Sequence, residues 1–288
     1  MPIVGLYRDL LNLSSRRLWP AFARSCYPKH KAYFDGLTDT YGPEVFGPDG
    51  LRQAVEAAGP ASLKAIRALV TQGGEPEPVA EALLDKCLPL LPGGPPRLYL
   101  ATLFFLAPAA TLSIGGEPAI AIGLERFTAG DPPPPPPGFP GRFTYRLPEL
   151  EEMIPHEACH VARMRTLSLP ATPRRLSLKE MVFLEGTALV FTDRLVGRDT
   201  LRTFMSEDVF RHHQTHDLDM RRLAAADFDR AGMEVFGRYF SPLAPVSGYY
   251  VGFSLCREYL NRFGEDQLSE LITLPSDEIL GRLHLGGA

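Results

Sequence analysis

Residues 154–162 read IPHEACHVA and place two histidines four positions apart in an apolar stretch, with a glutamate directly after the first. Residues i and i+4 lie on one face of an α-helix, one turn apart. His156 and His160 are therefore expected to direct both imidazoles toward one point, as neighbouring ligands of a tetrahedral zinc ion do. Glu157 is rotated by about 100° around the helix axis. That position suits a general base acting on a water beside the metal better than a third ligand.

A catalytic zinc site has a third protein ligand and keeps a fourth position open for water. The candidate is Glu185, the only charged residue in MVFLEGTALVF, residues 181–191. A buried carboxylate without a cation is costly or keeps its proton, and a metal ion removes this cost. Gly186 lowers helix stability by about 1 kcal/mol relative to Ala, but its missing side chain would let this helix approach a neighbour closely. The alternative is that Glu185 is solvated or pairs with an arginine.

The surrounding sequence predicts an α+β fold. Apolar residues at helical spacing predict helices over residues 49–58, 62–71 and 78–91, with Ser62 as an N-cap. A small sheet is expected from the β-prone runs 97–106, 110–114 and 119–124, with a hairpin turn at Gly115-Gly116. From about residue 147 the pattern is helical again. Helices are predicted at 147–165, 177–197, 206–215, 220–236 and 249–263, with two short ones near the end.

Three residues mark helix boundaries near the motif. Pro155 predicts a kink, or a helix whose regular hydrogen bonding begins there. Ser177 with Glu180 matches a capping box, and Gly197 lies where a helix would end.

Composition limits the classes of function. The hydrophobic content of 45% and charged content of 22% are ordinary for a folded soluble protein. A net charge of −4 gives no reason to expect nucleic acid as a partner. The longest apolar stretch, residues 98–116, is broken by Pro108, so no membrane association is expected. The N-terminus is charged too early for a signal peptide, and a cytoplasmic protein is therefore predicted. The four scattered cysteines are expected to be buried free thiols.

The sequence offers further candidates for the site. Stabilisation of an oxyanion usually needs a Tyr or His beside the metal. Tyr249 and Tyr250 lie at a predicted loop-to-helix junction, and Tyr250 is favoured for this role. The alternative is that both tyrosines pack against the helix end and cap it. His212, His213 and His216 lie among polar residues and predict a solvated helix end, with a secondary metal site as the alternative.

The remaining features concern the core and partners. Cys159 is expected in the core, with thiolate ligation as the alternative. The proline-rich segment 132–140 predicts a surface loop, with docking of a partner as the weaker interpretation. Residues 119–127, AIAIGLERF, are a candidate edge strand for pairing with a substrate backbone.

HEACH followed by EGTA resembles the gluzincin class of metallopeptidases. More closely, LSLKEMVFLEGTALVFTDRLVG, YYVGFSLCREYL and LSELITLPSDEIL resemble a bacterial family of predicted zinc-dependent proteases of YjaZ type, over roughly residues 96–283. The resemblance implies a zincin-like fold and zinc peptidase chemistry, with His156, His160 and Glu185 as ligands and Glu157 as base. The proline-rich loop and Leu189, where an acidic residue often follows EGxA, depart from the family pattern.

Together these features predict a mostly helical zincin-like α+β fold with a small mixed sheet beside the HExxH helix. Residues 1–92 would form a helical N-terminal region and residues 93–288 the catalytic domain. The predicted function is a zinc-dependent metallopeptidase acting on a peptide or protein. The alternatives are a non-catalytic, zinc-stabilised binding module and a metallohydrolase of non-peptide substrates.

Overall fold

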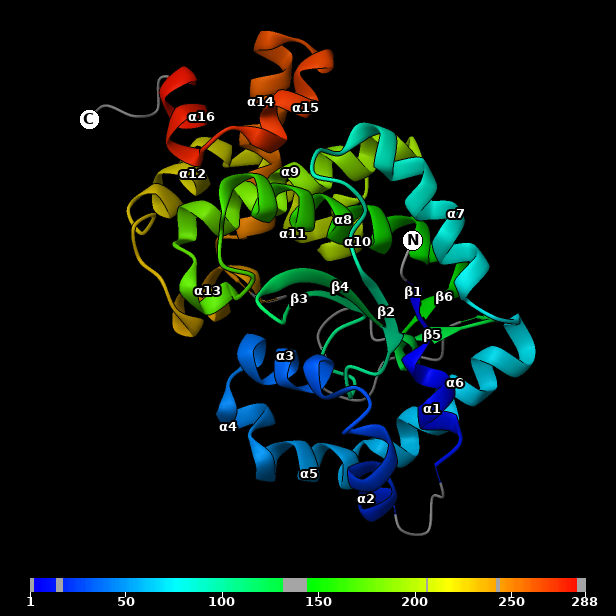
Figure 1. Ribbon diagram of the computed structural model, residues 1–288. Coiled ribbons are helices and arrows are strands. Elements are labelled where there is room, and N and C mark those ends of the chain that lie inside the picture. Colours follow the sequence, from blue (N-terminus) through cyan, green and yellow to red (C-terminus); the bar gives the residue numbers. More distant parts are fainter. Residues whose placement is uncertain (1–2, 14–17, 132–143, 206, 242–243, 284–288) are drawn as a thin grey trace. The chain divides into compact units, whose positions relative to one another are not determined.

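The computed structural model describes residues 3–13, 18–131, 144–205, 207–241 and 244–283 (Figure 1). Contacts between Cα atoms divide the chain into two compact units. The first contains Met1–Lys86 and Pro95–Glu157, and the second contains Cys87–Gly94 and Ala158–Ala288. Helix α8 (Leu150–Leu167) contributes residues to both. The boundary predicted at residue 92 stays a prediction, because these units are defined by contacts and not by independent folding.

The first unit contains a four-stranded sheet in the order β1-β2-β4-β3. Strand β2 pairs in parallel with both β1 and β4, and β3 is antiparallel to β4, so the predicted small mixed sheet is confirmed. Gly115 and Gly116 have φ of 64° and 85° and form the predicted hairpin turn, because a two-residue turn of this kind needs positive φ. The strands are β1 (Ile3–Val4), β2 (Leu98–Ala101), β3 (Ala109–Ile114) and β4 (Glu117–Gly123), with a separate parallel pair, β5 (Phe127–Thr128) and β6 (Tyr145–Arg146).

Strand β2 is shorter than the predicted run 97–106. The chain turns at Phe104 and Phe105, where φ is 51° and 64°. The buried Glu125 carboxylate holds this turn, because its Oε1 accepts hydrogen bonds from the backbone N–H groups of Leu103 (2.8 Å) and Phe105 (2.9 Å).

Seven α-helices precede the sheet hairpin in the described part of the sequence. One sheet face, carrying Leu112 and Ile114, packs with apolar residues of these helices such as Phe34 and Leu37. The predicted cap at Ser62 is wrong, because the helix already begins at Gly59, with Pro60 in its first turn as proline favours. The helices are α1 (Leu6–Leu11), α2 (Leu18–Ala21), α3 (Lys31–Tyr41), α4 (Pro43–Phe46), α5 (Pro48–Ala57), α6 (Gly59–Gly73) and α7 (Glu77–Cys87).

The second unit is helical. The single helix predicted over residues 220–236 is wrong, because the chain forms two helices joined by a connection that consists mainly of turns. Within that connection, the carbonyl groups of Phe228 and Arg230 accept hydrogen bonds from the N–H groups of Lys179 (3.0 Å) and Leu178 (2.7 Å), which open helix α9. The helices are α9 (Leu178–Val196), α10 (Leu201–Phe204), α11 (Glu207–Thr215), α12 (Asp217–Ala225), α13 (Met233–Phe240), α14 (Gly248–Phe263), α15 (Leu268–Thr273) and α16 (Ser276–Arg282).

Helices α9 and α14 cross where two glycines meet. A Cβ atom placed on Gly186 would lie 2.3 Å from the carbonyl carbon and oxygen of Gly252, and one placed on Gly252 would lie 2.1 Å from the carbonyl oxygen of Val182. Side chains cannot occupy either position without separating the helices. The close approach predicted for the helix around Gly186 is confirmed.

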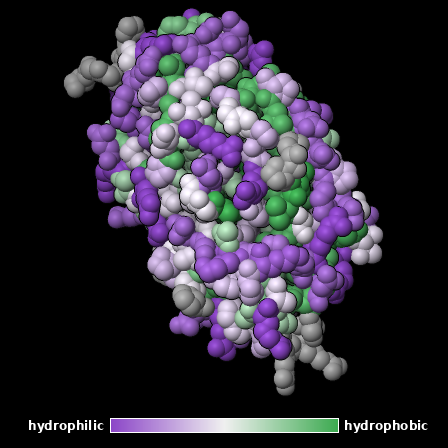
Figure 2. Space-filling view, viewed as in Figure 1, coloured by the Kyte–Doolittle hydropathy of each residue, from purple (hydrophilic) through white to green (hydrophobic). Residues whose placement is uncertain are grey.

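The surface and the cysteines agree with the composition. Polar side chains cover most of the face seen in Figure 2, with apolar ones in smaller groups between them. All four cysteines are buried free thiols, as predicted. None of the helices in the described residues is both long enough and apolar enough to cross a membrane.

Candidate metal centre

Three side chains converge as the sequence predicted. His156 and His160 of α8 and Glu185 of α9 each offer one ligand atom, and these atoms all lie within 4.8 Å of one another. The two imidazoles are 3% and 6% exposed. The Nε2 atom of His160 lies 3.5 Å from Oε2 of Glu185. Within the described residues this is the only group of three or more His, Cys, Asp or Glu side chains so arranged.

The arrangement fits a tetrahedral metal ion. With metal–nitrogen and metal–oxygen bonds of about 2.0–2.1 Å, neighbouring ligand atoms of a tetrahedral site lie about 3.3 Å apart. The 3.5 Å separation of the His160 and Glu185 atoms is close to this value. Two imidazole nitrogens and one carboxylate oxygen are donors that zinc accepts, and three protein ligands leave a fourth position for water.

Helix α8 gives the two histidines their spacing. The helix runs from Leu150 to Leu167 and contains Pro155 in its interior. Because the helix continues through Pro155, the histidines remain one turn apart on one face. This face is buried, which removes water that would otherwise compete for the imidazoles.

Helix α9 is fixed at both ends, and this positions Glu185. At the N-terminus the Ser177 side chain accepts a hydrogen bond of 3.2 Å from the N–H of Glu180, which confirms the N-cap half of the predicted capping box. The Glu180 carboxylate accepts a hydrogen bond from the Ser276 hydroxyl (2.8 Å). At the C-terminus Gly197 has left-handed φ, also as predicted.

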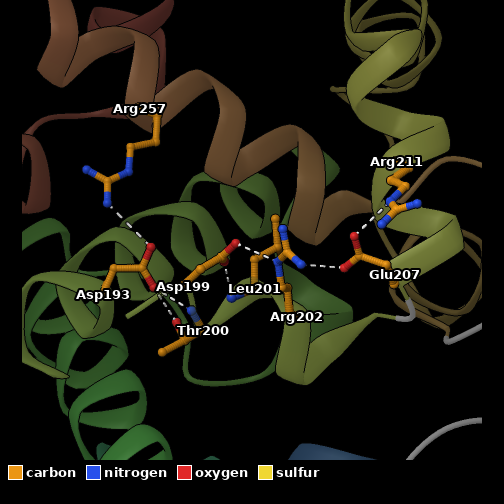
Figure 3. A network of polar contacts seen from close by, with 8 residues as sticks. All are labelled: Asp193, Asp199, Thr200, Leu201, Arg202, Glu207, Arg211 and Arg257. Atoms are coloured by element: carbon orange, nitrogen blue, oxygen red, sulfur yellow. Dashed lines mark hydrogen bonds and ion pairs between the residues drawn. The ribbon is translucent and has the colours of Figure 1, made fainter. Parts of the chain in front are cut away.

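A polar network anchors the last turns of α9 (Figure 3). Oδ1 of the buried Asp193 accepts hydrogen bonds of 2.7 Å from both the N–H and the hydroxyl of Thr200, and its Oδ2 lies 3.4 Å from the Arg257 guanidinium. Burial raises the pKa of Asp193, whereas Thr200 and Arg257 act in the opposite direction. Leu189 is fully buried with Leu201, Phe210 and Tyr250, so this position supports α9 by packing.

Glu157 is held by a residue that sequence reasoning missed. The Thr111 hydroxyl in β3 donates a hydrogen bond of 2.7 Å to Oε2 of Glu157, which is 7% exposed. The signal in the sequence was weak, because Thr111 is one hydroxyl in a β-prone run. The alternation of side chains along β3 places Thr111 on the sheet face opposite Leu112 and its helical core.

The two tyrosines lie at the start of α14. Tyr249 packs against the rings of Phe204 and Phe240, with centroids 5.1 and 5.2 Å away. The hydroxyl of Tyr250 interacts with Asp217 and Ser254, and burial together with Asp217 raises the pKa of Tyr250 to about 12. A role for Tyr250 at the metal centre stays a prediction.

The histidine cluster has two environments. His212 and His216 are exposed, as predicted for a solvated helix end. His213 is buried, and this corrects the prediction for that residue. The Ser247 N–H donates to Nε2 of His213 (2.9 Å), so Nδ1 carries the proton and donates to the Val209 carbonyl (2.7 Å). His213 therefore holds the N-cap of α14, and burial lowers its pKa.

Cys159 and the predicted edge strand can also be placed. Cys159 is fully buried, burial raises its pKa to about 12, and it is not part of the converging group. The edge-strand prediction for residues 119–127 is wrong, because β4, which contains residues 119–123, lies between β2 and β3 and has a partner on each side. The edge strands of this sheet are β1 and β3. The proline-rich segment 132–140 lies outside the described residues.

The comparisons with known proteins concern the part of the chain that holds the candidate centre. No curated protein and no solved structure matches the chain, so the zincin-like fold and the YjaZ-type assignment stay predictions. One family model does match. Residues 142–281, which include His156, Glu157, His160 and Glu185, are similar to the family described as Predicted Zn-dependent protease (DUF2268).

Proposed function

We propose that the protein is a zinc-dependent peptidase whose centre is formed by His156, His160, Glu157 and Glu185. The single observation that carries the proposal is the convergence of the two histidines and Glu185 within 4.8 Å, with a buried carboxylate next to the first histidine. The match of residues 142–281 to predicted Zn-dependent proteases supports the same chemistry.

His156, His160 and Glu185 would hold the metal ion. When bound, zinc acts as a Lewis acid and lowers the pKa of a coordinated water toward 7. Glu157 would take a proton from the attacking water and deliver it to the nitrogen of the leaving amine. The hydrogen bond from Thr111 fixes one carboxylate oxygen of Glu157 and so orients the proposed base.

The burial of His156 and His160 supports the proposed reaction. A protein site that excludes bulk water strengthens each electrostatic interaction inside it. His156 and His160 are nearly inaccessible, so their orientation does not depend on solvent. A peptide or protein is the proposed substrate, and the cytoplasm is the proposed location.

A non-catalytic, zinc-stabilised module is the alternative in another class. Such a site would need a fourth protein ligand. The converging group in the described part of the chain holds three, and the buried Cys159 lies outside it, which favours an open position. Hydrolysis of a non-peptide substrate would use the same residues.

The test combines metal content with hydrolysis. Mass spectrometry of purified wild-type protein is expected to find close to one zinc per chain, and the His160→Ala variant is expected to lose it. A peptide library is expected to be cleaved by the wild type. The Glu157→Gln variant should keep the metal and lose activity by at least about 100-fold. Full activity of Glu157→Gln would exclude the mechanism, and four protein ligands in a metal spectroscopic measurement would favour the module.

A further inference from the structure

Helix α3 of the N-terminal region lies along the outer edge of the sheet. In the antiparallel pair β3–β4, the N–H of Gly123 donates to the carbonyl of Pro108 (2.9 Å). In an antiparallel ladder only every second residue exchanges backbone hydrogen bonds with the partner strand. Since Pro108 bonds to β4, Thr111 and Ser113 lie at the alternate positions and direct their N–H and C=O groups away from β4. Helix α3 meets this edge at Ser113. The Ser113 N–H donates to Thr40 Oγ1 (3.4 Å), and a Cβ atom on Gly36 would lie 2.6 Å from the Ser113 carbonyl oxygen.

These two contacts define the direction of α3. Gly36 lies at the carbonyl side of Ser113 and Thr40 lies at its N–H side, so the helix runs antiparallel to β3. Beyond Thr40 the helix therefore advances toward Thr111, whose hydroxyl binds Glu157. The last residue of α3 is Tyr41.

The environment of Tyr41 agrees with this direction. Its ring is partly buried and packs edge-on against Phe46, with centroids 5.8 Å apart. Burial raises the pKa of Tyr41, and Glu157 is the charged group that adds most to the rise, followed by Glu125. The phenol is thus protonated at neutral pH. Within the described residues the Tyr41 hydroxyl has no hydrogen-bond partner, so it can donate to a bound molecule.

We propose that the hydroxyl of Tyr41 donates a hydrogen bond to the carbonyl oxygen of the substrate as this oxygen becomes negatively charged. The inference rests on the proposed peptidase function. Attack by water forms a C–O bond at the amide carbon and moves the carbonyl electron pair onto the oxygen. When the C–N bond breaks, that pair reforms the carbonyl and the leaving nitrogen takes the proton that Glu157 removed from water. A preformed donor to the oxyanion stabilises the charge developing in the transition state more than the neutral carbonyl.

Tyr41 is better placed for this role than Tyr250. The hydroxyl of Tyr250 already interacts with Asp217 and Ser254, in a network that also contains Arg221. The Tyr41 hydroxyl has no such partner in the described part of the chain, and Glu157, the proposed base, is the charged group that raises the pKa of Tyr41 most. The N-terminal helices would then complete the reaction centre, although the family match begins only at residue 142.

The experiment compares Tyr41→Phe, Tyr250→Phe and Tyr27→Phe with the wild type, all loaded with zinc. Tyr27 donates to Asp35 (3.2 Å) in the same helical region and is the matched control. Each protein is assayed for kcat and KM on the best library peptide. Zinc content is measured by mass spectrometry. Calorimetry measures the affinity for a phosphinic peptide, which mimics the tetrahedral intermediate of amide hydrolysis.

Tyr41→Phe is expected to lower kcat by about 100-fold and to weaken binding of the phosphinic peptide by a similar factor, with KM and zinc content unchanged. Tyr27→Phe should leave all four quantities unchanged. Wild-type kcat and phosphinic-peptide affinity in Tyr41→Phe would overturn the assignment of Tyr41 alone, and a loss confined to Tyr250→Phe would transfer the role to Tyr250. A zinc-loaded wild type that neither cleaves the library nor binds the phosphinic peptide would overturn the peptidase function and this inference with it.

Discussion

The Thr111 hydroxyl donates a hydrogen bond of 2.7 Å to Oε2 of Glu157 and thereby joins the edge strand β3 to the helix that carries both histidines. A carboxylate with one oxygen held by a hydrogen bond has fewer orientations, which lowers the entropic cost of placing it beside a reacting water. The contact assigns strand β3 a positioning function at the candidate centre.

Replacement of Thr111 by Val tests this positioning. Valine keeps the shape and removes the hydroxyl, so kcat is expected to fall by about 10-fold, within the range for outer partners of metal sites. Zinc content should stay unchanged, because no ligand is altered. Steady-state kinetics of Thr111→Val are compared with those of Ser113→Ala in the same strand, which should behave as the wild type. Equal kcat in all three proteins would show that Glu157 needs no support from β3.

Removal of the Glu185 carboxylate charge should weaken metal binding. The Glu185→Gln variant keeps the size of the side chain but offers a neutral amide. Its zinc affinity is expected to fall by at least about 100-fold, since even outer partners of a metal site account for 10- to 100-fold. Competition with a zinc-binding dye measures the change, with the exposed Glu234→Gln as the control. Unchanged zinc affinity in Glu185→Gln would remove this residue from the ligand set.

The crossing of α9 and α14 predicts opposite effects at two glycines. Gly186→Ala would place a methyl group against Gly252 and should lower the free energy of unfolding by about 1–3 kcal/mol. Gly237→Ala meets no atom within 4 Å in helix α13 and should raise it by about 0.5–1 kcal/mol. Urea unfolding monitored by circular dichroism measures both. A neutral effect of Gly186→Ala would show that the two helices can separate freely.

The buried His213 should make stability depend on pH. Burial lowers the pKa of its imidazole in the folded state. As pH falls below about 6.5, the unfolded chain binds a proton that the folded state still excludes. The free energy of unfolding therefore decreases with falling pH, by up to about 1.4 kcal/mol per pH unit, until the lowered pKa is reached.

A His213→Gln variant should lack this contribution. Its free energy of unfolding is compared with that of the wild type between pH 7 and 4.5 with a chelator present, so that the candidate metal ligands titrate alike in both proteins. The difference between the two is expected to shrink as pH falls. The exposed His216→Gln is the control and should follow the wild type. Parallel curves for His213→Gln and wild type would mean that the pKa of His213 is the same in the folded and unfolded states.

Local sequence features were sufficient to predict the parts of the centre that lie on single helices. The spacing of His156 and His160 depends only on helical periodicity, which residues 150–167 satisfy. The isolated charge of Glu185 in an apolar run indicated a buried partner, and the adjacent Gly186 indicated a close helix crossing. Ser177 and Gly197 marked the ends of α9, because capping uses backbone groups within a few residues.

Contacts between distant segments were decided by the tertiary structure. Thr111 lies 46 positions before Glu157 in the sequence, and their hydrogen bond exists only because a strand and a helix pack together. His213 is exposed in a helix considered alone, but it becomes buried when the loop before α14 covers it. In the same way, the β-prone runs could be identified from the sequence, but the strand order depends on pairing between distant segments. This pairing places β3 at one edge of the sheet and β4 in its interior.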